Sequence, residues 1–180
     1  LAAAPGGKYL QAMETPGLIG IASDASYQRA TQMPGHNRMV ADATRALPFS
    51  KPFDRILLDA PCSGTGTLRR HPDIAWLKDE DDVARLTLAQ DRLLVHATAL
   101  LKPGGTLVYA VCSLQEDEGP ARIEALLARD RRLTRQKVMP SELPDLADAI
   151  TPAGDVRTLP SMWPERGGLD GFYIARLSIG

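Results

Sequence analysis

The chain contains two cysteines, and each one follows a short apolar segment. Cys62 lies in residues 59–66 (DAPCSGTG), directly after the apolar run 56–58, and Cys112 follows the run 107–111. Short apolar runs bounded by turns are typical of buried parallel strands. In open α/β sheets, ligands and reactive groups gather beyond the carboxyl ends of the strands. We therefore expect the two thiols to face one crevice, where a thiolate can act as a nucleophile.

Two other roles remain open for these cysteines. A structural disulfide between Cys62 and Cys112 is one alternative, and a pair of buried, inert thiols is the other. A chain of 180 residues with two cysteines has no dense disulfide framework. Sparse cysteines are typical of a reducing compartment, so we expect a cytoplasmic protein.

Length and composition indicate one globular domain. The 180 residues are 44% hydrophobic and 24% charged, with a formal net charge of −1. No apolar run approaches the roughly 20 residues of a membrane-spanning helix, so we expect no membrane partner. The whole chain also lacks the basic excess of a typical nucleic-acid-binding domain. Basic residues do cluster locally, at residues 69–71 (RRH) and at residues 129–137.

Apolar spacing and turn residues predict alternating strands and helices. We expect strands at residues 18–22, 38–41, 53–58, 106–111 and 171–177, and helices at residues 6–13, 25–33, 83–101 and 121–127. Residues 102–105 (KPGG) should end the long helix, and residues 140–164 are rich in proline and should be irregular. This alternation predicts an α/β fold with a mostly parallel, doubly wound sheet.

Three acidic residues follow three successive predicted strands: Asp24, Asp42 and Asp59. In a nucleotide-binding α/β fold, such acids can accept hydrogen bonds from ribose hydroxyls and from an adenine amino group, or reach the reaction centre. Each could instead cap the helix that follows it, since Asp is a preferred N-cap residue.

A glycine-containing loop lies at residues 4–8 (APGGK). It matches neither the dinucleotide glycine pattern nor the triphosphate-binding loop, which disfavours a nicotinamide-dependent oxidoreductase. Gly6 and Gly7 would let the backbone approach a ligand, and Lys8 could attract an anion. Since no strand precedes the loop, we expect a fragment with a truncated first strand.

Together, residues 4–8, 59–66 and 109–113 (YAVCS) resemble the Sun (Fmu, Nop2-like) family of RNA cytosine-5 methyltransferases, in its bacterial ribosomal RNA branch. Residues 67–73 (TLRRHPD) and 169–173 (LDGFY) support the resemblance, which covers nearly the whole chain. It implies a Rossmann-like class I fold that uses S-adenosylmethionine to methylate carbon 5 of cytosine in RNA, with small-subunit ribosomal RNA as the expected partner. Residues 1–180 would then be the catalytic domain, without its upstream RNA-binding region.

The resemblance also implies roles for individual residues. Cys112 would attack carbon 6 of cytosine, Cys62 would assist release of the adduct, and Asp59 would hydrogen-bond the base. The residues expected to bind the cofactor are Ala2, Ala3, Ala4, Pro5, Gly6, Gly7, Lys8, Asp24, Asp42 and Asp59. The basic residues expected to hold RNA phosphates are Arg69, Arg70 and His71. We predict no metal site, and we expect Trp76 and Trp163 to be packing residues.

The chain departs from the family pattern at a few positions. Ala2 stands where the family usually has a cysteine, Val111 stands where it usually has a threonine, and the segment from Asp24 to Asp42 is shorter than usual. Two other functions remain open. A DNA cytosine methyltransferase would use Cys62 as its nucleophile, and a cofactor-binding remnant or RNA-binding scaffold would perform no chemistry.

Overall fold

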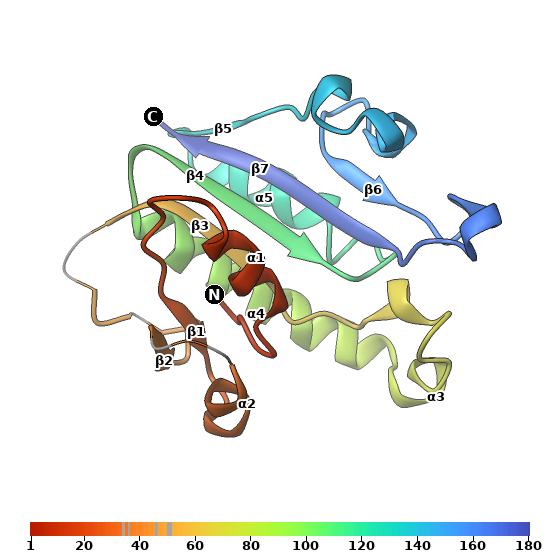
Figure 1. Cartoon of the computed structure of the whole chain (residues 1–180), viewed down its shortest axis with the longest axis horizontal. Helices are drawn as coiled ribbons and strands as arrows, with labels where there is room; N and C mark the ends of the chain where they lie inside the picture. Colours follow the sequence, from red (N-terminus) through yellow and green to blue (C-terminus); the bar gives the residue numbers. More distant parts are fainter. Residues whose placement is uncertain (34, 36, 46, 50–51) are drawn as a thin grey trace.

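The core of the fold is a mixed sheet of five strands (Figure 1). The computed structural model describes residues 1–33, 35, 37–45, 47–49 and 52–180. The strands are β3 (Phe53–Asp59), β4 (Leu101–Val111), β5 (Leu133–Arg135), β6 (Val156–Thr158) and β7 (Phe172–Ile179). β3 and β4 are parallel, whereas β7 runs antiparallel to β4, β5 and β6. β3 and β4 therefore end at the same edge of the sheet.

A second, smaller sheet holds β1 (Ala22–Asp24) and β2 (Arg38–Val40), which are parallel. The first residues of the chain lie between the two sheets. The Ala3 amide donates to the Ser23 carbonyl at 2.9 Å, and the Asp59 amide donates to the Leu1 carbonyl at 3.3 Å. These contacts bring the carboxyl end of β1 close to that of β3.

Five α-helices accompany the sheets in the described part of the chain: α1 (Gly7–Met13), α2 (Tyr27–Gln32), α3 (Ile74–Leu77), α4 (Glu80–Ala99) and α5 (Pro120–Arg129). α4 begins in a capping box, in which Asp79 accepts from the Asp82 amide while the Asp82 side chain accepts from the Asp79 amide. α4 and α5 lie together on the face of the sheet opposite α1 (Figure 1). Within the described ranges, no helix has the length and apolar character needed to cross a membrane.

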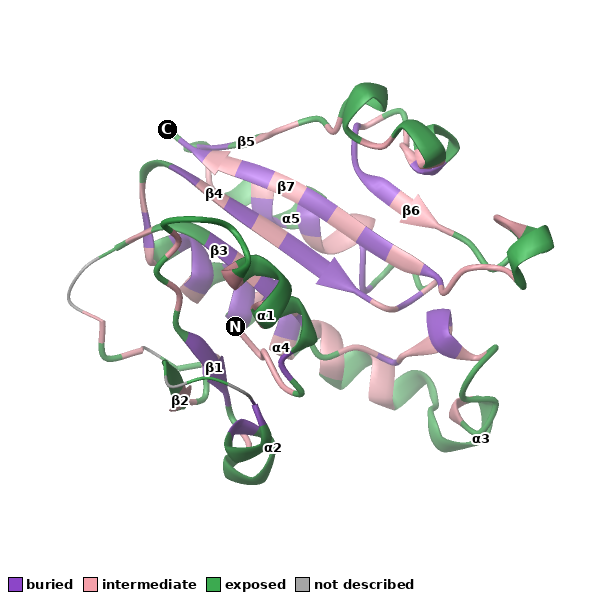
Figure 2. Cartoon of the chain, viewed as in Figure 1, coloured by how far each residue is buried: buried purple, intermediate pink, exposed green. Residues whose placement is uncertain are grey.

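The hydrophobic core lies between the central strands and the α4–α5 layer. Residues along β7 alternate between half-buried and buried positions (Figure 2), as expected for a strand with two different faces. Leu58, Leu107, Tyr109 and Leu177 are all fully buried in this core. Close packing therefore fixes the relative positions of β3, β4 and β7.

The predicted α/β class is confirmed, with differences in detail. The sheet is more mixed than predicted, because all three pairings of β7 are antiparallel. The predicted strand at residues 18–22 begins at Ala22 and extends to Asp24. β5 was not predicted, and β6 lies inside residues 140–164, which we expected to be irregular. Residues 102–105 follow the end of α4 as predicted but belong to β4, with Gly104 at φ 76°.

Candidate active site

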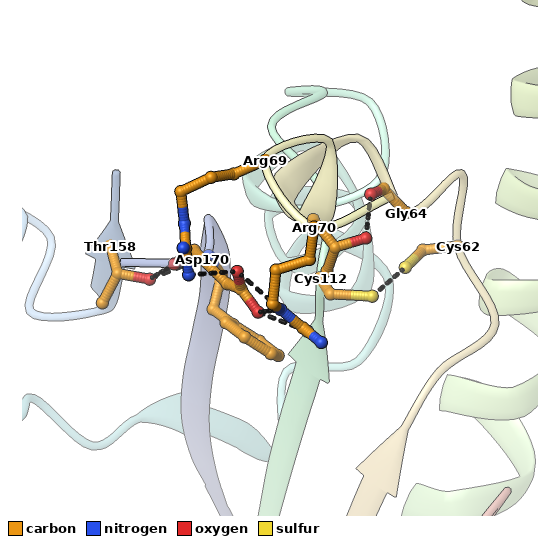
Figure 3. A network of polar contacts seen from close by, with 9 residues as sticks. Cys62, Gly64, Arg69, Arg70, Cys112, Thr158 and Asp170 are labelled. Atoms are coloured by element: carbon orange, nitrogen blue, oxygen red, sulfur yellow. Dashed lines mark hydrogen bonds and ion pairs between the residues drawn. The ribbon is translucent and has the colours of Figure 1, made fainter. Parts of the chain in front are cut away.

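The two thiols lie against each other at the carboxyl ends of β3 and β4. The Cys62 and Cys112 sulfurs are 3.3 Å apart (Figure 3). They come together because β3 and β4 are parallel neighbours, with Asp59 paired to Ala110 in the ladder. Both cysteines are free, and a disulfide would need a sulfur separation near 2.05 Å. The structure therefore contradicts the disulfide alternative.

The contact between the thiols makes them chemically different. The hydrogen bond from the Cys62 thiol stabilises the Cys112 thiolate and lowers the pKa of Cys112 to about 7, although burial opposes the shift. The same hydrogen bond, together with burial, raises the pKa of Cys62. Near neutral pH, Cys112 is thus the thiol that ionises, and Cys62 keeps its proton and donates the hydrogen bond to Cys112. Since the thiolate is the reactive form, the environment favours Cys112 as a nucleophile.

Asp59 and Lys8 form an ion pair close to the thiols. The Lys8 ammonium nitrogen lies 2.6 Å from the Asp59 carboxylate and 5.6 Å from the centroid of the Phe172 ring. The Asp59 charge raises the pKa of Cys112 and the Lys8 charge lowers it. Three segments far apart in sequence therefore meet here: the glycine loop, which together with the two residues before it spans residues 2–8, the end of β3 and the start of β7.

The glycine loop has an unusual backbone and an open surface. The Ala4–Pro5 peptide bond is cis, Ala2 has φ 53° and Gly6 has φ 107°. A side chain at Gly6 would be strained, because only glycine adopts such a φ readily. At Gly7, by contrast, an added Cβ would meet no atom within 4 Å. The loop thus leaves room in front of its backbone.

Asp24 and Asp42 differ in environment although both follow strands. Asp24 is 1% exposed and accepts hydrogen bonds from the amides of Ala4 at 3.3 Å and Ser26 at 2.9 Å. Asp42 is exposed and accepts from the Thr44 hydroxyl at 2.6 Å, a bond that lowers the pKa of Asp42. Neither acid caps a described helix, since the N-cap of α2 is Ser26.

The predicted RNA-binding arginines are engaged with an acid of their own chain. Arg70 donates to Asp170 at 2.8 Å, and Arg69 reaches the same carboxylate at 3.4 Å (Figure 3). Their charges are thus partly balanced within the molecule, while His71 is exposed. The expectation that Trp76 packs in the core is wrong, because Trp76 is 90% exposed on the short helix α3. Trp163 is half-buried, and the Arg166 guanidinium carbon lies over its ring, 4.7 Å from the ring centroid.

Sequence reasoning missed one residue that connects the thiols. Glu118 is fully buried and accepts hydrogen bonds from Ser63 and Ser113, the residues that directly follow Cys62 and Cys112. In the sequence, Glu118 ends an acidic run (residues 116–118), a pattern typical of an exposed surface. The repeated Cys-Ser pair was the signal available, since two hydroxyls beside two thiols suggest a shared partner.

The mixed sheet with helices is consistent with a Rossmann-like class I methyltransferase fold, and solved structures of similar chains agree. The protein PH0851 is 28% identical to this chain with a TM-score of 0.82, over 98% of this chain and 41% of that one. A methyltransferase homolog protein from Pyrococcus horikoshii is 27% identical with a TM-score of 0.68, over 97% of this chain and 58% of that one.

Sequence comparison identifies the family. The profile described as "16S rRNA methyltransferase RsmB/F" matches residues 1–178. The "Ribosomal RNA small subunit methyltransferase B" of Erwinia tasmaniensis is 37% identical over 188 residues, which cover 98% of this chain and 41% of that protein. The chain therefore belongs to the RsmB/F family of 16S rRNA methyltransferases. It spans about two fifths of the length of this curated relative.

Proposed function

We propose that the protein methylates carbon 5 of cytosine in small-subunit ribosomal RNA, using S-adenosylmethionine and a covalent cysteine adduct. The observation that carries this proposal is the pair of free thiols 3.3 Å apart, of which Cys112 has a pKa lowered to about 7. Family membership supports the ribosomal RNA substrate, because the profile that matches the chain describes 16S rRNA methyltransferases. A cytoplasmic location fits this substrate.

Carbon 5 of cytosine is a weak nucleophile, and the thiols would solve this problem. The Cys112 thiolate forms a bond to carbon 6, which moves an electron pair onto carbon 5. S-adenosylmethionine, when bound, would supply the methyl group for carbon 5, with the electron pair of its S–CH3 bond left on the sulfur of a neutral thioether product. Asp59, the last residue of β3, lies at the same edge of the sheet as Cys112. It would hydrogen-bond the base and hold the ring over the Cys112 sulfur.

Release of the product requires a base, and Cys62 fits that role. Once Cys112 is bonded to carbon 6, the Cys62 thiol no longer has the hydrogen bond to the Cys112 thiolate, or the thiolate's negative charge beside it, that raise the pKa of Cys62. Cys62 can then lose its proton to solvent and accept the proton of carbon 5. The electron pair of the broken C–H bond re-forms the ring double bond, and Cys112 leaves as a thiolate. One proton is released per turnover.

The residues near the glycine loop fit the proposed cofactor. S-adenosylmethionine carries a cationic sulfonium, an ammonium group, a carboxylate and ribose hydroxyls. Asp24 and Asp59 are suited to the cations and hydroxyls, and Lys8 is suited to the carboxylate. The open space at Gly7 would allow the backbone of residues 2–8 to approach the ligand. Asp42, exposed beyond β2, would accept from the adenine amino group.

Arg69, Arg70 and His71 would hold RNA phosphates beside the thiols. A phosphate competing for Arg70 must replace the Asp170 carboxylate, which is bonded to it at 2.8 Å. We further propose that most RNA recognition uses residues outside 1–180, in a longer protein of the kind that the Erwinia tasmaniensis relative represents, since this chain covers 41% of that relative. Target bases must leave their stack to reach such a site.

A trapping experiment with the longer protein tests the division of labour between the thiols. Cys62→Ala should accumulate a covalent RNA adduct, visible by denaturing gel, because attack proceeds while release stalls. Cys112→Ala should form no adduct and produce no 5-methylcytosine. The reverse pattern would favour a DNA-type mechanism with Cys62 as nucleophile. Wild-type protein that does not bind S-adenosylmethionine in calorimetric titration would instead favour a non-catalytic scaffold.

A further inference from the structure

A buried carboxylate lies directly beneath the two thiol turns, which are residues 62–66 after β3 and residues 112–114 after β4. The Glu118 side chain has no exposed surface, and each of its oxygens accepts two hydrogen bonds. The mechanism above assigns it no chemical step. Its place between the two turns suggests that it controls their separation.

One oxygen of Glu118 connects the two turns directly. Oε2 accepts from the Ser63 hydroxyl at 2.5 Å and from the Ser113 hydroxyl at 2.6 Å. These serines are the immediate neighbours of Cys62 and Cys112 in the chain. Moving either turn by more than a few tenths of an ångström would lengthen one of these bonds beyond the usual range for O–H···O contacts.

The other oxygen fixes the backbone around Cys62. Oε1 accepts from the Ser63 amide at 2.8 Å and from the Gln90 side-chain amide at 3.1 Å. The same Gln90 nitrogen donates to the Pro61 carbonyl at 2.8 Å. The residues on both sides of Cys62 are therefore held, one by Gln90 of α4 and the other by Glu118.

Because Glu118 is buried, its carboxylate depends on all of these hydrogen bonds. Among the described residues, no lysine or arginine forms an ion pair with Glu118. Amide and hydroxyl donors therefore offset the loss of hydration of its carboxylate. A buried carboxylate without such partners is strongly unfavourable. The Glu118 backbone is anchored as well, because the buried Tyr109 hydroxyl donates to its carbonyl at 2.7 Å. The carboxylate therefore cannot follow one turn away from the other.

We propose that Glu118 is a positioning residue that clamps the two Cys-Ser turns together and thereby sets the separation of the Cys62 and Cys112 sulfurs. This inference rests on the proposed function for its catalytic meaning, since the separation matters only if both thiols act on one base. The geometric claim itself can be tested without RNA or cofactor.

Phenylarsine oxide is a suitable probe, because its arsenic binds two thiols only when they lie close together. Two As–S bonds form, the two thiol protons and the arsenic-bound oxygen leave as water, and no oxidant is required. The reduced wild-type protein should bind one equivalent tightly. Glu118→Ala should bind at least tenfold more weakly, while both of its thiols still react with iodoacetamide.

Three further variants make the result specific. Glu118→Gln should stay within about threefold of the wild type, because the amide oxygen can still accept from Ser63 and Gln90 while its nitrogen donates to the two hydroxyl oxygens. Ser113→Ala should weaken binding at least threefold, since it removes the hydrogen bond from the Cys112 turn to Glu118 and leaves those of the Cys62 turn in place. Glu116→Gln alters a side chain that is 82% exposed in the same acidic run and should match the wild type.

Each outcome decides the proposal. Wild-type affinity in both a folded Glu118→Ala protein and Ser113→Ala would overturn it, and if Glu118→Ala does not fold, Ser113→Ala decides alone. Glu118→Gln as defective as a folded Glu118→Ala would overturn positioning in favour of a charge effect. In methylation assays of the longer protein, Glu118→Ala should lower kcat and leave the KM for S-adenosylmethionine within twofold. Wild-type protein that fails to methylate RNA would refute the proposed function, while the arsenical measurements still decide the role of Glu118.

Discussion

The two regions that would carry out the reaction are built in opposite ways. The thiol turns are closed by buried hydrogen bonds, and the backbone of Gly66 donates to the Cys112 carbonyl at 3.0 Å while accepting from the Gly171 amide at 2.7 Å. The glycine loop (residues 4–8) is open, with exposed residues at Pro5, Gly7 and Lys8. The difference teaches that covalent chemistry requires a fixed distance between two groups of the protein, whereas ligand binding requires free backbone.

Adding one methyl group at Gly66 should have the largest effect. A Cβ there would lie 1.9 Å from the Gly171 carbonyl oxygen, so the backbone on one side must move. We expect Gly66→Ala to lower the free energy of unfolding by about 3 kcal/mol or more. Urea unfolding measures this change, and the same experiment on Ser161→Ala, an exposed position, provides a control. Wild-type stability would show that the thiol turns are more adaptable than the structure indicates.

Removing one thiol should change the ionisation of the other. In Cys62→Ala the hydrogen bond that stabilises the Cys112 thiolate is lost, so the pKa of Cys112 should rise from about 7. The ordinary cysteine pKa is about 8.5, so the thiolate fraction at pH 7, and with it the alkylation rate, should fall on the order of tenfold. Iodoacetamide alkylation followed from pH 5 to 10 measures the shift. An unchanged pH midpoint would contradict the proposed coupling.

In the region that would bind the cofactor, single residues should matter less. Asp42→Ala removes one exposed acceptor, and one hydrogen bond contributes about 1 kcal/mol, so the affinity for S-adenosylmethionine should fall about fivefold. Calorimetric titration measures the affinity. Asp54→Ala removes a carboxylate that is 80% exposed at the other end of β3 and should leave the affinity unchanged. Equal affinities in both variants would place the adenine elsewhere.

The smallest effect should come from a methyl group in the glycine loop. Gly7 is the first residue of α1, and nothing lies within 4 Å of a Cβ built there. Gly7→Ala should therefore raise the free energy of unfolding by about 0.5 kcal/mol, because alanine is favoured over glycine in helices. Thermal unfolding without ligand measures the change. A loss comparable to that of Gly66→Ala would remove the contrast between the two regions.

The sequence predicts the central elements well because their signals are local. Continuous apolar runs identify β3 and β4, and apolar residues at helical spacing identify α4. Each cysteine directly follows the turn or strand end that closes one of these runs. The strands β5 and β6 were missed because each has three residues with a single apolar one among them, and each is stabilised by pairing with β7. Propensity carries little information about such short strands.

The same reasoning explains which parts of the site could be predicted. Family motifs identify the thiols, Asp59 and the glycine loop, and the structure brings these together around Lys8. The burial of Glu118 and the pairing of Arg70 with Asp170 depend on contacts between segments about 55 and 100 residues apart. No pattern along the chain reports such contacts, so the sequence predicted neither the partner of Arg70 nor the burial of Glu118.

The bond between Gly171 and Gly66 also bears on how the protein is made. A ribosome completes β3, β4 and both cysteines well before it reaches β7, which supplies Gly171 and the strand that pairs with β4. Until then one edge of β4 has no partner and the first thiol turn lacks its final contact. During synthesis both cysteines would therefore be present before β7 completes the contacts around the first thiol turn, an interval in which the partly folded chain is vulnerable to misfolding.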